Sequence, residues 1–216
     1  MTPADQSATA REICAMAPIV PVIVVNDTAH AEPLARALVA GGLRALEVTL
    51  RTPCALDAIR AMVDVEGGVV GAGTLITPAD VKAAKAAGAK FGVAPGFSEK
   101  LVKACEDEGL PLLPGAVTAS EIMQALEWGY DMLKFFPAAN AGGPAALKAL
   151  GGPLPQVSFC PTGGVSLQNA RDYLSLPNVL CAGGSWVAPA GMMNAGNWTG
   201  IEALAAEAAA LSRAKA

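Results

Sequence analysis

The sequence predicts an α/β protein folded as a (β/α)₈ (TIM) barrel, in which parallel strands alternate with helices. Short apolar runs closed by turn residues alternate regularly with Ala- and Leu-rich segments of helical spacing. The runs are apolar throughout, which is typical of parallel strands covered on both faces. A length of 216 residues suits one barrel, so we expect a single domain over residues 1–216 with a short helix before the first strand. An open doubly wound sheet is the structural alternative.

The expected elements follow one another in strict order along the chain. The apolar runs predict strands at Ile19–Val25, Ala45–Leu50, Val69–Leu75, Phe91–Pro95, Leu112–Gly115, Met132–Pro137, Val157–Pro161 and Val179–Gly183. The helical spacing predicts helices at His30–Ala40, Ala55–Val63, Pro78–Ala87, Ser98–Glu108, Thr118–Trp128, Pro144–Leu150, Leu167–Leu174 and Ile201–Ala214. Thr77-Pro78 and Ser98 are typical of helix starts, and Gly88 and Gly109 of helix ends.

Composition and charge exclude several classes of protein. Hydrophobic residues make up 53% of the chain, which excludes disorder, and a chain of this size buries enough surface to fold without disulfides or metals. The net charge of −4 and the lack of a basic stripe argue against nucleic-acid binding. The run Ile19–Val25 is far shorter than the ~20 residues that span a bilayer, and the N-terminus lacks a signal-peptide pattern. We therefore expect a cytoplasmic protein that contacts no membrane.

Cysteine and histidine usage disfavours metal and cofactor chemistry. The five cysteines are odd in number and form no C-x-x-C pair, so we expect reduced thiols that are mostly buried. His30 is the only histidine, which argues against a His-rich metal site and a Ser-His-Asp triad and favours a surface or capping role for His30. No G-x-G-x-x-G motif opens a helix, so dinucleotide binding has little support. We expect neither a metal nor a cofactor.

Two expected strands carry charged residues toward the barrel interior. The two-residue repeat of a strand puts Glu47, Thr49 and Arg51 on one face. Lys134 interrupts the apolar strand Met132–Pro137, and it is the one lysine expected to be desolvated. Burial favours the uncharged amine, which is the form that attacks a carbonyl to make a Schiff base. The alternative is an ion pair between Lys134 and Glu47 that only plugs the barrel.

Glycine-rich segments follow the last two expected strands. Cys160-Pro161-Thr162-Gly163-Gly164 ends the seventh strand, and Gly183-Gly184-Ser185 ends the eighth. Barrels often bind phosphate through backbone N–H groups in the loops after these two strands. The position and the composition together predict a phosphate site, although glycine pairs also occur in ordinary turns.

These motifs together resemble those of a known family. They are Glu47-Val48-Thr49-Leu50-Arg51, Gly71-Ala72-Gly73-Thr74, Leu113-Pro114-Gly115, Lys134-Phe135-Phe136-Pro137-Ala138, Phe159-Cys160-Pro161-Thr162-Gly163-Gly164 and Gly183-Gly184-Ser185-Trp186. In this order they resemble the bacterial 2-keto-3-deoxy-6-phosphogluconate (KDPG) aldolase and 4-hydroxy-2-oxoglutarate aldolase family, over about Pro18 to Leu204. The resemblance implies a class I, Schiff-base-forming lyase of the Entner–Doudoroff pathway, without a cofactor and with a homotrimer as its assembly.

The resemblance also implies a role for each matching residue. Lys134 would form the imine and Glu47 would act as the general acid and base. The residues that would hold the pyruvoyl end are Arg51, Thr74, Pro95 and Phe136, and those that would hold the phosphate are Thr162, Gly163, Gly164, Gly184 and Ser185. Two alternatives remain open: the same chemistry on 2-keto-3-deoxy-6-phosphogalactonate, and a non-catalytic barrel that binds a sugar phosphate.

Overall fold

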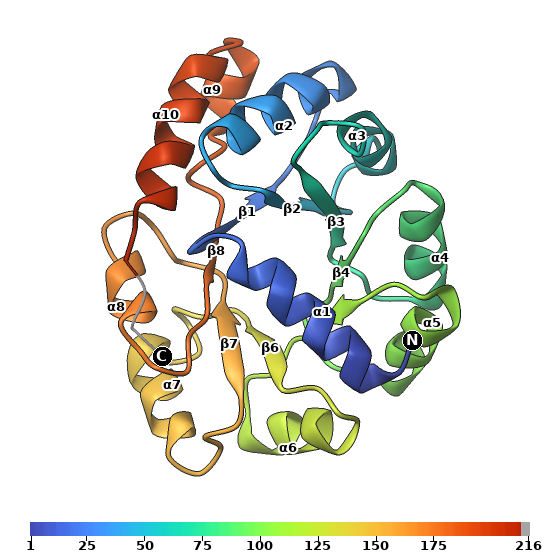
Figure 1. Cartoon of the computed structure of the whole chain (residues 1–216), viewed down its shortest axis with the longest axis vertical. Helices are drawn as coiled ribbons and strands as arrows, with labels where there is room; N and C mark the ends of the chain where they lie inside the picture. The colour runs from blue at the N-terminus through green and yellow to red at the C-terminus, as the bar shows by residue number, and fades with distance from the viewer. Residues whose placement is uncertain (213–216) are drawn as a thin grey trace.

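Parallel strands follow one another around the molecule, and each is followed by at least one helix (Figure 1). The computed structural model describes residues 1–212. Its strands are β1 (Ile19–Ile23), β2 (Ala45–Thr49), β3 (Val69–Gly73), β4 (Gly92–Val93), β5 (Leu112–Leu113), β6 (Met132–Phe135), β7 (Ser158–Pro161) and β8 (Ala182–Gly184). Its helices are α1 (Pro3–Ala15), the 3₁₀ turn η1 (Thr28–His30), α2 (Ala31–Ala40), α3 (Ala55–Met62), α4 (Pro78–Ala86), α5 (Glu99–Glu108), α6 (Ala119–Glu127), α7 (Gly143–Gly151), α8 (Ala170–Leu174), α9 (Ala190–Asn194) and α10 (Trp198–Ala209).

The strands form two parallel sheets joined by short bridges. One sheet has the order β5-β4-β3-β2-β1-β8, and the other pairs β6 with β7. The isolated bridges across the two gaps are Gly115–Lys134, Phe159–Val179 and Thr162–Gly183. The backbone N–H of Lys134 also donates to the carbonyl of Pro114 at 2.8 Å. The predicted parallel α/β class is therefore confirmed, while the hydrogen-bonded ladder around the ring is interrupted at two places.

The predicted strands are longer than the hydrogen-bonded ladders. Val25 and Leu75 are fully buried, yet both lie beyond the ends of β1 and β3. The predicted strand Phe91–Pro95 is reduced to two paired residues. An apolar run predicts that its residues are buried, but it does not predict which of them hydrogen-bond to a neighbouring strand. A buried residue just beyond the end of a strand therefore looks the same in the sequence as one within the strand.

Several helix ends have the expected chemistry. Thr77 and Thr118 each form a capping box with an acidic residue three positions later, and Gly109 ends α5 in the left-handed region. Ser98 stands at the start of α5 without a side-chain cap hydrogen bond. The segment Leu167–Leu174 is helical only in its second half, since α8 begins at Ala170. The predicted helix over 201–214 starts earlier and ends at Ala209, and positions 213 and 214 lie outside the described residues.

The apolar core has two layers. The larger one packs the helices against the strands. The smaller one fills the barrel interior and combines residues of α1 with inward residues of the strands: Ala10, Ile13, Cys14, Val20, Ala45, Phe91, Val93, Leu113, Met132, Cys160 and Cys181. Among the described residues, no helix is long and apolar enough to cross a membrane.

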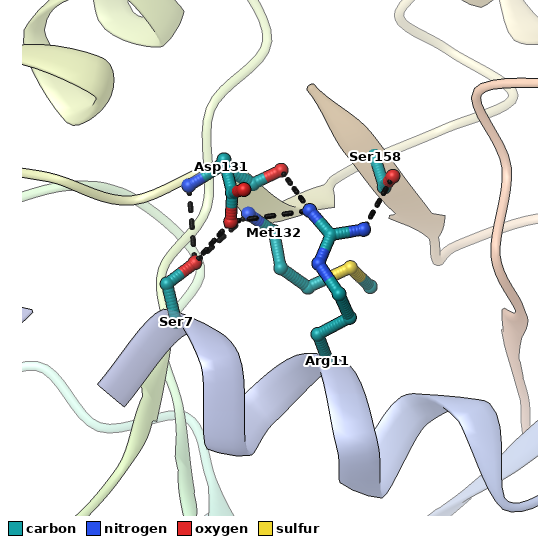
Figure 2. A network of polar contacts seen from close by, with 5 residues as sticks. All are labelled: Ser7, Arg11, Asp131, Met132 and Ser158. Atoms are coloured by element: carbon teal, nitrogen blue, oxygen red, sulfur yellow. Dashed lines mark hydrogen bonds and ion pairs between the residues drawn. The ribbon is translucent and has the colours of Figure 1, made fainter. Parts of the chain in front are cut away.

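Helix α1 crosses the barrel and covers the amino ends of the strands (Figure 1). The hydroxyl of Ser7 donates to the carboxylate of Asp131 at 2.7 Å and accepts from the backbone N–H groups of Asp131 and Met132. The guanidinium of Arg11 donates to Ser158 at 2.7 Å and forms an ion pair with Asp131 at 3.1 Å (Figure 2). These contacts connect α1 to the first residues of β6 and β7.

This network lowers the pKa of the Asp131 carboxyl. Partial burial acts to raise its pKa, but hydrogen bonds from Ser7 and Arg11 and the charge of Arg11 outweigh burial, so the pKa lies below its ordinary value. A lowered pKa means that the network stabilises the fold at neutral pH and that this contribution is lost as the pH falls through the lowered value.

We expect Ser7→Ala to lower the melting temperature by roughly 5 °C, because the N–H of buried Met132 and the N–H of partly buried Asp131 lose their acceptor, and a buried donor left without a partner costs about 1–3 kcal/mol. Glu12→Ala, at an exposed position of the same helix, is the matched control and should leave the melting temperature unchanged. Calorimetry of both variants measures the effect. Equal melting temperatures for the two would contradict the proposed connection of α1 to the barrel.

Candidate active site

A buried ion pair spans the barrel interior near the carboxyl ends of the strands. Lys134 lies on β6 and Glu47 on β2, and these strands stand opposite one another in the order of the ring. The Lys134 Nζ donates to Glu47 Oε1 at 3.1 Å, and the two side chains are only 4% and 3% exposed. Desolvating two charges costs several kcal/mol per ion, which their attraction repays only in good geometry. The pair is therefore better explained by chemistry than by stability.

A hollow of about 180 Å³, here called the lysine pocket, opens beside Lys134. It is lined by Arg51, Thr74, Pro95, Lys134 and Phe136. The Nε of Arg51 donates to the hydroxyl of Thr74 at 3.3 Å, and the Nζ of Lys134 lies 5.4 Å from the centre of the Phe136 ring. A guanidinium with free N–H groups beside a buried amine can hold a carboxylate while the amine attacks an adjacent carbonyl.

The backbone of Thr74 is strained. Its φ is +64°, and Thr74 is the one non-glycine residue among residues 1–212 with a positive φ. A β-branched residue in this region is a true outlier, and such strain costs about 1–3 kcal/mol. It follows β3 directly, at the point where its hydroxyl meets Arg51. The surrounding structure therefore holds Thr74 in place for its contact in the pocket.

A second hollow, here called the glycine pocket, has a volume of about 210 Å³ and shares Arg51 and Phe136 with the lysine pocket. Its lining residues are Val22, Val24, Arg51, Phe136, Thr162, Gly163, Gly164, Val165, Gly183 and Ser185. Gly163 and Gly164 have φ values of +97° and +74°, which favour glycine and present backbone N–H groups. Arg51 is its one cationic lining residue, so an anion bound there would rely on N–H groups and hydroxyls.

Most of the predicted residues line these two adjoining hollows, and three do not. Glu47 contacts Lys134 but lines neither hollow. Gly184 packs against the ring of Trp186, and its neighbour Gly183 lines the glycine pocket instead. Thr49 is fully buried, and its hydroxyl donates to the carbonyl of Ile23, so it supports β1. Arg51 lies just beyond the end of β2, in the turn that follows Thr49.

The apolar wall of the glycine pocket was not predicted from the sequence. Val22 and Val24 line it from β1 and the residue after β1, and Val165 lines it from the loop after β7. The signal was present, since inward positions recur at every second residue of a strand. The four residues after Pro21 are all valine or isoleucine, however, so the sequence does not distinguish the inward face of this strand from its outward face.

Three buried thiols lie beneath the ion pair. All five cysteines are free, as expected, and Cys14, Cys160 and Cys181 meet in the inner core. Cys160 is the register partner of Lys134 across β6 and β7. Hydrogen bonds from Cys14 and Cys181, together with the charge of Lys134, lower the pKa of Cys160 in spite of its burial. Within residues 1–212, no group of His, Cys, Asp and Glu side chains could hold a metal ion.

A larger hollow, of about 310 Å³, lies away from this chemistry. It is found near the amino ends of β7 and β8, where Ser158 and Asn178 are part of its wall. Lys148 is its one charged lining residue. Without a paired acid and base, this hollow is a poorer candidate for catalysis than the lysine pocket.

Comparison with known proteins points to one family. A family model described as the KDPG and KHG aldolase family of aldolases matches residues 10–204. The 2-dehydro-3-deoxy-phosphogluconate aldolase of Dickeya dadantii is 50% identical over 94% of this chain and 95% of its own. The KHG/KDPG aldolase of Escherichia coli K12 is 51% identical over 93% of this chain and 94% of its own.

Two solved structures are similar throughout. The 2-keto-3-deoxy-6-phosphogluconate aldolase of Zymomonas mobilis ZM4 with 3-phosphoglycerate has a TM-score of 0.92 at 48% identity and covers 96% of this chain and 98% of its own. The KDPG aldolase of Legionella pneumophila, with pyruvate captured as a covalent carbinolamine intermediate, has a TM-score of 0.89 at 45% identity and covers 93% of this chain and 98% of its own.

We expect Thr74→Gly to raise the melting temperature by about 2–4 °C, because glycine adopts a positive φ without strain and relief of strain exceeds the added entropy of the unfolded chain. Thr74→Val keeps the branched side chain and should not raise it. Calorimetry of the two variants side by side measures the difference. A glycine variant that melts no higher than the valine variant would show that Thr74 is unstrained.

Proposed function

This chain belongs to the KDPG and KHG aldolase family, and we propose that it cleaves 2-keto-3-deoxy-6-phosphogluconate reversibly to pyruvate and glyceraldehyde 3-phosphate. The observation that carries the proposal is the buried Lys134–Glu47 pair at the edge of the lysine pocket. A Schiff-base lysine needs a dry site and an acid within reach, and both are present. The Escherichia coli relative is named for KHG as well as KDPG, so 4-hydroxy-2-oxoglutarate, cleaved to pyruvate and glyoxylate, is the proposed second substrate.

Lys134 starts the reaction as the nucleophile. Its Nζ gives a proton to Glu47, 3.1 Å away, and attacks the C2 carbonyl of the substrate to form a carbinolamine. Glu47 returns this proton to the hydroxyl of the carbinolamine, which leaves as water, so a protonated imine and the Glu47 carboxylate remain. The covalent carbinolamine of the Legionella relative supports this order of steps.

The lysine pocket orients the keto acid. Arg51 binds the substrate carboxylate through its planar guanidinium. The hydroxyl of Thr74, which accepts from Arg51 Nε at 3.3 Å, is a second group beside the carboxylate. Pro95 and Phe136 form the walls beside the reacting carbon. A lysine in place of Arg51 could not make the two parallel hydrogen bonds of a guanidinium.

Glu47 moves the protons of the cleavage step. Its carboxylate takes the proton of the C4 hydroxyl, the C3–C4 bond breaks, and the electron pair flows into the imine to leave an enamine and the free aldehyde. Glu47 then returns a proton to C3, and water releases pyruvate and restores the Lys134 amine. Apart from this water, each step uses groups that the chain itself supplies.

The glycine pocket receives the distant phosphate. Backbone N–H groups of Gly163 and Gly164 and the hydroxyls of Thr162 and Ser185 are the proposed donors. Gly184, which lies against Trp186, is not among the lining residues. The two hollows share Arg51 and Phe136, so one extended substrate can occupy both. The Zymomonas relative is described with 3-phosphoglycerate, a compound that carries the same kind of group.

The assembly and the location follow from the family resemblance. We propose a homotrimer in the cytoplasm, and analytical ultracentrifugation of the purified protein tests the trimer directly. A monomeric mass under assay conditions would reject it.

We expect sodium borohydride with pyruvate to attach a stable, reduced adduct to Lys134, because only an imine is trapped in this way. Peptide mass spectrometry locates the adduct. Lys148→Met, which removes an exposed lysine far from the pair, should be labelled fully, and Lys134→Met should not be labelled. A wild-type protein without this adduct would contradict the proposal that the chain is an aldolase.

We expect Ser185→Ala to raise the KM for the phosphorylated substrate by about tenfold or more, since a hydrogen bond to a charged group is worth about 1.5–3 kcal/mol. Steady-state kinetics with 4-hydroxy-2-oxoglutarate, which has no phosphate, is the control and should change by less than about twofold. An equal rise for both substrates would remove Ser185 from the phosphate site.

A further inference from the structure

Gly73, the last residue of β3, lies against the side chain of Glu47. A Cβ added to Gly73 would stand 2.7 Å from Glu47 Cγ and 2.9 Å from Glu47 Cδ, and closer still to Oε1. Real Cβ atoms essentially never approach other atoms below 3.0 Å. The carboxylate therefore lies over bare backbone that any side chain at position 73 would cover.

Backbone conformation does not explain the glycine. Gly73 is not among the glycines with positive φ, so its backbone is open to alanine. Glycine also weakens a strand and usually marks a close approach of another group. Gly71 shares the inward face of β3 with Gly73, and a Cβ there would meet the ring of Phe91 instead. The contact with Glu47 therefore accounts for glycine at position 73.

The position of the carboxylate matters because Oε1 of Glu47 is the atom that meets Lys134. A Cβ at position 73 would take the space over β3 that the carboxylate now occupies, so the carboxylate would have to move away from β3. A side chain at position 73 would thus shift the acid and lengthen its 3.1 Å contact with the lysine.

We infer that Gly73 is a positioning residue for the reaction: it leaves the space in which Glu47 holds its carboxylate for proton transfer at C3 and C4 of the substrate. This inference rests on the proposed function, because it assigns Gly73 a role through the general acid and base. It predicts that Gly73→Ala impairs proton transfer more than it impairs folding or keto-acid binding.

The first test is the exchange of pyruvate methyl protons with deuterium from the solvent, followed by NMR. The exchange requires an imine and then removal and return of a proton at C3, and it needs no aldehyde. Gly73→Ala should slow it by about a hundredfold, the effect of a misplacement of about 1 Å, with a much smaller change in the KM for pyruvate. Gly96→Ala is the matched control, since a Cβ at Gly96 meets nothing within 4 Å.

A double-mutant cycle separates a displaced acid from a damaged site. In Glu47→Gln the acid is already lost, so adding Gly73→Ala should change the remaining rate of borohydride trapping by less than about twofold. A further large loss in the double variant would show that Gly73 acts by another route and would overturn the inference.

A stability cycle tests the contact without any activity. Gly73→Ala should lower the melting temperature of the wild-type protein by several degrees. In a background with Glu47→Ala and Lys134→Met, which removes both charges and vacates the space, the same change should have little effect. An equal fall in both backgrounds would overturn the inference.

The outcomes also separate this inference from the proposed function. Wild-type protein that neither exchanges nor traps pyruvate would overturn both. Wild-type protein that exchanges normally, with Gly73→Ala matching Gly96→Ala, would overturn only the role of Gly73.

Discussion

The structure depends on one constraint, which is that an ammonium and a carboxylate share the dry interior of a barrel. Lys134 and Glu47 come from opposite sides of the ring, so neither is positioned by its own strand alone. Burying two charges is costly unless the geometry is good. Apolar side chains and three thiols pack below them, and α1 covers the amino ends of the strands. The lysine pocket opens beside Lys134.

Strain and bare backbone accompany this pair at the carboxyl ends of the strands. Thr74 holds a conformation that its side chain disfavours, and glycines at 73 and 183 leave room for the side chains of Glu47 and Thr162. Each of these features weakens the local fold and improves the placement of a polar group. Local rules of stability fail where a site needs a particular geometry.

The sequence predicted the alternation of strands and helices, because apolar runs and helical spacing are local patterns. It also singled out Lys134 and Glu47, since a charge inside an apolar strand is conspicuous. It did not predict how α1 packs, because Ser7 and Asp131 are 124 residues apart and no spacing connects them. Nor did it predict why position 73 is glycine, since that reason appears only when β2 and β3 lie side by side. Strand ends were inaccurate because burial continues beyond the ladder.

The course of α1 has a practical consequence for handling the protein. Helix α1 lies over the amino ends of the strands, while both pockets open at the carboxyl ends. A linker to a solid support, joined through exposed Met1, would leave the mouth of the barrel facing the surrounding liquid. Immobilised in that orientation, the molecule would keep both pockets accessible to a substrate dissolved in the flowing solution.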